Sequence, residues 1–171
     1  GQADNTIVCF NADHGDYLGD FNLMLKGALS SDAINRVPFI WSDPTGASGA
    51  TSGALASTID IASTVLERAE LDPYFGLQGR SLLSHMAGEP GQSHREDLLI
   101  EFNDGMPRMG FATPARVRTL VSSRWRMSVY EGQDWGELYD RSVDPNDTNN
   151  LWDDPAYLAD KAALSVRLNH L

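Results

Sequence analysis

The sequence contains little cysteine, little positive charge and no long apolar run. The single cysteine, Cys9, cannot close a disulfide within the chain, so nothing indicates an oxidising compartment and a cytoplasmic location is favoured. No apolar run approaches the ~20 residues that a membrane-spanning helix needs. Thirteen basic against twenty-four acidic residues give a net charge of -11. We therefore expect neither nucleic acid nor a membrane surface as a partner.

The chain has 171 residues, of which 42% are hydrophobic, and this is typical of a folded protein with a hydrophobic core. The apolar run at residues 6–10 predicts a central parallel strand that is covered on both faces. A second run at residues 37–41 predicts its neighbour in the same sheet. Between them, residues 14–36 hold three glycines among polar residues, which favours a long functional loop over a continuous helix.

The second half of the chain shows different periodicities. A capping-box pattern at residues 57–60 predicts a helix that continues to residue 69, and residues 98–102 predict a strand. Alternation over 116–130 and a further strand at 137–140 predict an antiparallel meander. Asp154 and Pro155 predict the start of a terminal helix on that meander, with Tyr157, Leu164, Leu168 and Leu171 on one face. We expect an α/β core in residues 1–103 and an antiparallel subdomain with the terminal helix in residues 104–171.

Two adjacent side chains, Asp13 and His14, follow the first predicted strand, at the place where an open α/β sheet positions ligands. Gly15 permits a turn there, so the carboxylate and the imidazole can converge on one divalent cation. Two protein ligands are too few for a complete site, and a capped surface turn is the structural alternative. Lys26 lies in a loop beside Gly27, where its ammonium can neutralise a sulfate or phosphate oxygen or simply face solvent.

The other reactive side chains are not candidates for the site. Cys9 lies between Val8 and Phe10, an apolar setting that leaves a thiol inert. His85, His94 and His170 show no metal-ligand spacing, and we expect them at the surface.

Several segments, in this order, resemble the C-terminal half of the sulfatase family within the alkaline phosphatase superfamily. They are residues 11–20, 25–27, 35–40, 59–62, 78–82, 137–140 and 144–151, so the resemblance covers nearly the whole chain. It implies a partial alkaline-phosphatase-like mixed sheet with flanking helices, followed by a C-terminal antiparallel sheet and a terminal helix.

The resemblance also implies roles for individual residues. Asp13 and His14 correspond to two ligands of a divalent cation, Ca²⁺ or Mn²⁺, and Lys26 to a catalytic lysine that binds the transferred sulfate or phosphate. An Asp-His pair in place of Asp-Asn is similar to the branch of choline sulfatases and phosphonate monoester hydrolases. Phosphonate or phosphate ester cleavage is therefore the rival to sulfate ester cleavage, and both imply a small anionic ester as substrate.

The chain departs from the family pattern in two ways. Phe21 and Asn22 stand where relatives commonly carry His-Gly, and the Cys/Ser-x-Pro-x-Arg segment that yields the formylglycine nucleophile occurs nowhere in the chain. We expect that segment and a pair of acidic metal ligands upstream, in the N-terminal part of the same enzyme. The chain alone is then inactive, and its cut sheet edges predict either contact with the missing part or a homo-oligomer. The alternative is a noncatalytic relic or binding module.

Overall fold

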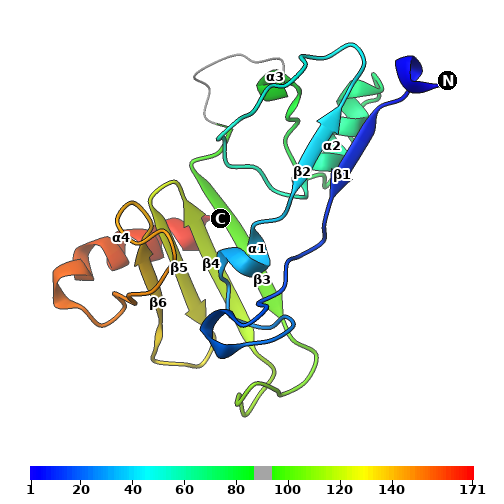
Figure 1. Ribbon diagram of the computed structural model, residues 1–171. Coiled ribbons are helices and arrows are strands. Elements are labelled where there is room, and N and C mark those ends of the chain that lie inside the picture. Colours follow the sequence, from blue (N-terminus) through cyan, green and yellow to red (C-terminus); the bar gives the residue numbers. More distant parts are fainter. Residues whose placement is uncertain (87–93) are drawn as a thin grey trace. The chain divides into compact units, whose positions relative to one another are not determined.

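The computed structural model describes residues 1–86 and 94–171, which divide into two compact units (Figure 1). The first unit consists of Gly1–Asp13 and Val37–Glu96, and the second of His14–Arg36 and Asp97–Leu171. The fold class is confirmed as mixed α/β with two antiparallel sheets and a C-terminal helix. The sequence-based division at residue 103 stays a prediction about domains.

The first unit contains a two-stranded sheet, formed by β1 (Val8–Asn11) and β2 (Phe39–Ser42). The two predicted strands are neighbours, but they pair antiparallel, with Val8 opposite Ser42, so the predicted parallel arrangement is wrong. Cover on both faces is also wrong, because Phe10 is 57% and Ile40 58% exposed. A short apolar run indicates a strand, but it does not indicate the direction of the neighbouring strand or what covers it.

The described α-helices of the first unit follow this sheet in the sequence, and a 3₁₀ turn precedes it. Ser57 donates its backbone N–H to the Asp60 carboxylate over 2.9 Å, the reciprocal bond of a capping box, and the predicted helix follows it. The unit's helical segments are a 3₁₀ turn at Ala3–Asn5, α2 (Asp60–Arg68) and α3 (Leu83–Met86).

The second unit is built on a four-stranded antiparallel sheet in the order β3-β4-β5-β6. The predicted meander is confirmed, and the strand predicted at 98–102 forms its edge, paired with β4, rather than part of an α/β core. The strands are β3 (Asp97–Asn103), β4 (Arg116–Ser122), β5 (Trp125–Tyr130) and β6 (Gly136–Asp140).

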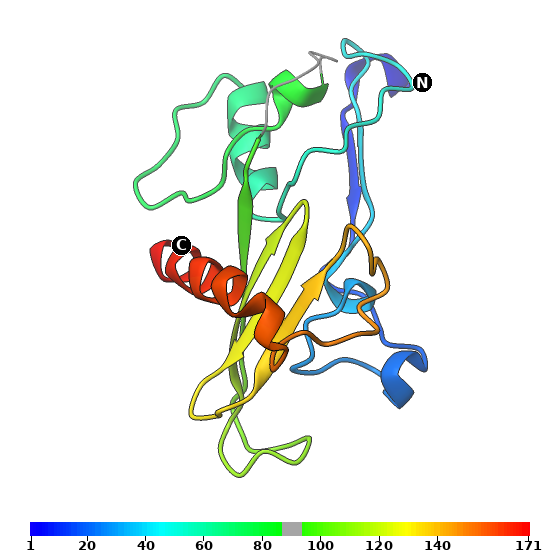
Figure 2. The same cartoon turned by 90° about the vertical axis from the view of Figure 1, so that its left-hand side faces the viewer.

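One face of this sheet carries the terminal helix (Figure 2). Asp154 accepts a hydrogen bond from the Ala156 amide and begins a 3₁₀ turn, Pro155–Tyr157, which leads into α4 (Leu158–His170). Leu164 and Leu168 are buried against Leu120, Met127 and Leu138, as predicted. Leu171, which was predicted on the same face, lies just beyond the end of α4 and is 47% exposed.

The opposite face of the sheet is covered by residues 14–36. Side chains alternate between the two faces of a strand, so Val117 and Tyr130 lie opposite the helix-facing set and pack with Ala28. The predicted long loop is confirmed, with helical turns only at η2 (Asp20–Asn22) and α1 (Asp32–Asn35). The loop that carries Lys26 therefore has a rigid support.

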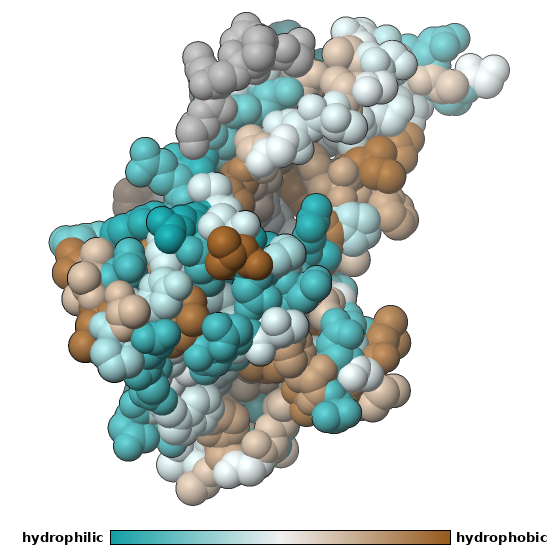
Figure 3. Space-filling view, turned by 60° about the vertical axis from the view of Figure 1, so that its left-hand side comes forward, coloured by the Kyte–Doolittle hydropathy of each residue, from teal (hydrophilic) through white to brown (hydrophobic). Residues whose placement is uncertain are grey.

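The surface keeps hydrophobic side chains among hydrophilic ones, as the brown residues among the teal ones in Figure 3 illustrate. Within the described part of the chain, no helix has the length and apolar character to cross a membrane.

Candidate functional site

The structure brings together two of the three predicted site residues, His14 and Lys26, in the second unit. The Nε2 atom of His14 lies 2.5 Å from the Nζ atom of Lys26, and His14 Nδ1 lies 2.7 Å from the Gly15 carbonyl oxygen. A carbonyl oxygen only accepts, so Nδ1 carries the ring proton and Nε2 presents its lone pair to the ammonium. His14 is therefore a neutral acceptor in this arrangement.

Gly15 allows the loop to approach α1 closely. Its amide donates to the Ile34 carbonyl over 2.8 Å, and a Cβ on Gly15 would lie 1.8 Å from the Ala33 carbonyl oxygen. A side chain at this position would push the backbone next to His14 away from the helical turn. The glycine that the sequence pattern places here has a direct steric reason.

Asp13 is the last residue of the first unit, and its side chain is exposed. Its peptide bond joins it to His14, the first residue of the second unit. Among residues 1–86 and 94–171 no group of three or more His, Cys, Asp or Glu side chains could hold a metal ion. The cation site at Asp13 and His14 stays a prediction.

Behind the loop lies a buried polar network that the sequence did not reveal. The Arg126 side chain, 1% exposed, places its Nε atom 2.9 Å from Asp147 Oδ2 and its Nη1 atom 3.6 Å from Glu137 Oε2, and it donates to the Ser30 carbonyl. Tyr130 donates to the same Oε2 atom of Glu137 over 2.8 Å. Arg126 therefore ties the segment after Lys26 to the sheet.

A second buried polar cluster corrects the prediction for His94, which was expected at the surface. His94 and Asp60 are both buried, and His94 Nε2 lies 3.2 Å from Asp60 Oδ2. Asp60 also accepts from the Arg80 amide and from Arg95. Burial alone would raise the pKa of Asp60, but these donors hold it below its usual value. This cluster lies in the first unit and joins α2 to Arg80, His94 and Arg95.

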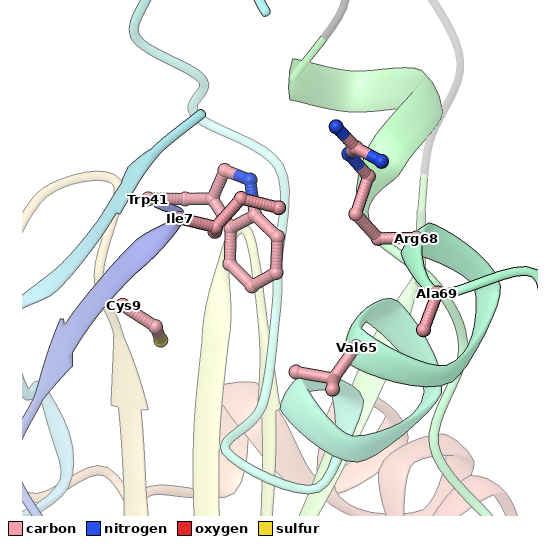
Figure 4. Close-up of a pocket in the computed structure, with 6 residues that line it drawn as sticks. All are labelled: Ile7, Cys9, Trp41, Val65, Arg68 and Ala69. Atoms are coloured by element: carbon pink, nitrogen blue, oxygen red, sulfur yellow. The ribbon is translucent and has the colours of Figure 1, made fainter. Parts of the chain in front are cut away.

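The first unit also has a pocket, between its two strands and α2 (Figure 4). Arg68 at the pocket is paired with Asp43 at 2.5 Å, and Cys9 contributes a thiol. No predicted metal or oxyanion residue lines it, so it does not extend the site. Its lining residues are Ile7, Cys9, Trp41, Val65, Arg68 and Ala69.

Comparison with known proteins relates the chain to one family. Residues 19–171 match the family model described as N-sulphoglucosamine sulphohydrolase, C-terminal. The chain is 32% identical to the uncharacterized sulfatase YidJ of Escherichia coli over 90% of the chain and 29% of that protein. It is 28% identical to the multifunctional alkaline phosphatase superfamily protein PehA of Trinickia caryophylli over 99% of the chain and 36% of PehA.

Among solved structures, the fold is similar to that of the phosphonate monoester hydrolase SpPMH from Silicibacter pomeroyi. The TM-score is 0.89 and the identity 27%, over 99% of the chain and 35% of SpPMH. The chain thus spans about a third of the length of these relatives.

Proposed function

Since this chain belongs to the sulfatase family, through the C-terminal domain described for N-sulphoglucosamine sulphohydrolase, we propose that it is the C-terminal portion of a metal-dependent sulfuric ester hydrolase. The observation that carries this proposal is the 2.5 Å contact between His14 Nε2 and Lys26 Nζ. The two groups are twelve residues apart in the chain and have opposite tasks, one to hold a cation and one to bind an oxyanion. Their convergence supports a shared site.

The state of His14 fits metal binding. A histidine ligand usually donates its second ring N–H to a carbonyl or carboxylate, which fixes the tautomer and leaves the other nitrogen for the metal. The Nδ1 bond to the Gly15 carbonyl makes Nε2 the acceptor atom in this way, and in the structure the group that contacts Nε2 is itself a cation, the Lys26 ammonium. We propose that Asp13 and His14 are two ligands of Ca²⁺ or Mn²⁺, and that the N-terminal part of the enzyme provides the other ligands and the formylglycine nucleophile. A divalent cation at such a site supplies Lewis-acid polarisation of the ester.

Lys26 is the second functional group. The chain carries a net charge of -11, so an anionic ester needs local positive charge at its binding site. The Lys26 side chain is exposed on its loop, and its ammonium can donate to an oxygen of the transferred group. In the transition state the same ammonium stabilises the charge that develops on the leaving oxygen.

A second candidate reaction is cleavage of phosphonate or phosphate esters in the same site. It is favoured by the TM-score of 0.89 to SpPMH and by the similarity to PehA. Sulfate and phosphonate monoesters are both anionic and tetrahedral, so Lys26 and the cation can bind either. The values of kcat/KM for a sulfate ester and for a phosphonate ester decide between the two reactions.

The test uses the full polypeptide that carries this sequence, with a 4-nitrophenyl sulfate and a phosphonate monoester as substrates. Lys26 and Lys161 are the two lysines of the chain, and Lys161 on α4 donates to the Trp152 carbonyl over 2.6 Å. We expect Lys26→Met to lower kcat/KM by about 10²–10³-fold, as for the loss of one oxyanion donor. Lys161→Met serves as the matched control and should leave kcat/KM within about threefold. Equal effects of the two variants would contradict the proposal.

Metal binding is tested separately by calorimetric titration of the same polypeptide with Mn²⁺ or Ca²⁺. We expect Asp13→Asn and His14→Ala to weaken binding by about 10-fold or more each. The chain of 171 residues alone, which has no nucleophile motif, should show no turnover. A full polypeptide without turnover of either ester would instead favour a noncatalytic relic or binding module.

A further inference from the structure

Tyr17 forms hydrogen bonds on both sides of Lys26. Its backbone N–H donates to the Leu25 carbonyl over 2.8 Å, and its hydroxyl donates to the Leu29 carbonyl over 2.7 Å. Lys26 lies between these two acceptors in the sequence. The Tyr17 side chain is 1% exposed, so the ring is fixed by its surroundings and its hydroxyl has a defined place.

The backbone that Tyr17 holds is not in a relaxed conformation. Phe21 and Leu25, which are not glycines, have φ values of 56° and 63° in the left-handed region. Such residues cost free energy and persist only where the surrounding structure fixes them. Leu25 directly precedes Lys26, so the direction in which the Lys26 side chain leaves the backbone depends on this constrained turn.

The support behind Leu29 is equally firm. The next carbonyl, that of Ser30, accepts from the buried guanidinium of Arg126, and Asp32 pairs with Arg141 over 2.5 Å. Burial raises the pKa of the Tyr17 hydroxyl, which therefore keeps its proton and stays a donor at neutral pH. On the C-terminal side of Lys26, the Tyr17 hydroxyl therefore holds the Leu29 carbonyl, and Arg126 of the sheet holds the next carbonyl, that of Ser30.

We propose that Tyr17 is a positioning residue: its two hydrogen bonds set the backbone of residues 25–29 and so aim the Lys26 ammonium at the transferred oxyanion. This inference rests on the proposed function for the role of Lys26. The positioning itself rests on the Tyr17 contacts alone, and the two parts can be tested apart.

The kinetic test is a double-mutant cycle in the full polypeptide. Tyr17→Phe keeps the ring and removes the hydroxyl with its bond to the Leu29 carbonyl, and we expect it to lower kcat about tenfold, the effect of roughly one hydrogen bond. In the Lys26→Met background the same change should have no further effect, because the group that Tyr17 positions is gone. An equal loss in both backgrounds would overturn the proposal, since it would mean that Tyr17 acts on stability or on another group.

Tyr139→Phe is the matched control. Tyr139 is also a buried tyrosine, but its hydroxyl donates to Glu137 Oε1 over 3.1 Å and not to a backbone carbonyl of the 25–29 segment. We expect kcat of this variant to stay within about twofold of the unmodified protein. A loss as large as that of Tyr17→Phe would show a general effect of removing a buried hydroxyl and would overturn the proposal.

Hydrogen exchange provides a readout that does not need activity. In Tyr17→Phe the amides of residues 25–31 should exchange about tenfold faster, while those of β4 and β5 keep their rates; in Tyr139→Phe residues 25–31 should be unchanged. If the full polypeptide hydrolyses neither ester, the proposed function fails while the exchange rates still decide the positioning. Unchanged exchange at residues 25–31 in Tyr17→Phe overturns the proposal whatever the activity.

Discussion

His94 Nε2 lies 3.2 Å from the Asp60 carboxylate, and both side chains are buried in the first unit. Burial lowers the pKa of His94, and the hydrogen bond to Asp60, which acts in the opposite direction, does not restore its usual value of 6.5. The unfolded chain therefore takes up a proton on this imidazole at a higher pH than the folded chain does. Stability from His94 is complete above about pH 6.5 and decreases as the pH falls towards the folded pKa.

We predict that the free energy of unfolding, measured with urea, decreases between pH 7 and pH 5, with a His94 contribution of at most about 1.4 kcal/mol per pH unit. His94→Gln keeps an amide donor for Asp60 but cannot titrate, so the slope in this range should become flatter. His170→Gln, at the exposed end of α4, is the control. The same slope in the His94→Gln variant would contradict the depressed pKa.

Chemical labelling tests the contact between His14 and Lys26. The Lys26 ammonium donates to the imidazole, so Nζ must leave this hydrogen bond before it can react, and His14→Ala should make Lys26 more reactive. A hydrogen bond of about 1 kcal/mol corresponds to roughly fivefold faster acetylation by acetic anhydride. Mass spectrometry gives the ratio of modified Lys26 to modified Lys161, which is an internal reference on α4. An unchanged ratio would mean that the contact is not populated in solution.

Backbone strain in the loop gives a prediction for stability. Leu18 has a φ of 48° and is 79% exposed, so its side chain contributes little packing while its backbone pays for the left-handed conformation. Asparagine tolerates this region better than leucine does. We expect Leu18→Asn to stabilise the protein by about 0.5–1 kcal/mol in urea unfolding. Val143→Asn, at an equally exposed site without a positive φ, should leave the free energy of unfolding unchanged. Equal stabilisation by the two substitutions would mean that a polar side chain in place of an exposed apolar one, and not relief of backbone strain, causes the effect.

The elements that could be predicted from the sequence carry their signal locally. The alternation in β4 and β5, the helix predicted after Ser57 and the Asp154-Pro155 start of the terminal helix each depend on neighbouring residues, and each is confirmed. The capping box is formed only in part, because Ser57 donates its N–H to Asp60 but its side chain does not cap α2. The prediction that β1 and β2 pair in parallel was wrong, because the direction of pairing depends on residues about thirty positions apart and on what covers the sheet. The burial of His94 was missed for the same reason, since Asp60 lies 34 residues away.

The candidate site was predictable only in part. His14 and Lys26 are candidates on sequence grounds, and the structure adds the contact between them, the tautomer of His14 and the two hydrogen bonds that Tyr17 donates. Nothing in the sequence marked Arg126, because strand alternation shows that a side chain lies on one face but not that a loop from residues 14–36 buries that face.

Arg126 gives the last prediction. Its guanidinium is buried between the carboxylates of Asp147 and Glu137, and its Cζ atom lies 4.5 Å from the centre of the Tyr139 ring. Arg126→Met would leave two buried carboxylates without their cation and would also remove the donor to the Ser30 carbonyl. We expect a loss of about 3–5 kcal/mol in the free energy of unfolding at pH 7. Arg118→Met, which breaks the exposed pair with Glu101 and the hydrogen bond to the Leu168 carbonyl, should cost only about 1–2 kcal/mol.

The pH dependence of this loss identifies its cause. Burial already raises the pKa of Asp147, and Arg126 is among the groups that oppose the rise. Without the guanidinium the folded pKa of Asp147 should increase further, so the folded variant binds a proton that the unfolded chain binds only at lower pH. Its stability relative to the unmodified protein should therefore recover as the pH falls from 7 towards 5. A deficit that is the same at both pH values would mean that lost packing, and not uncompensated charge, accounts for the effect of the substitution.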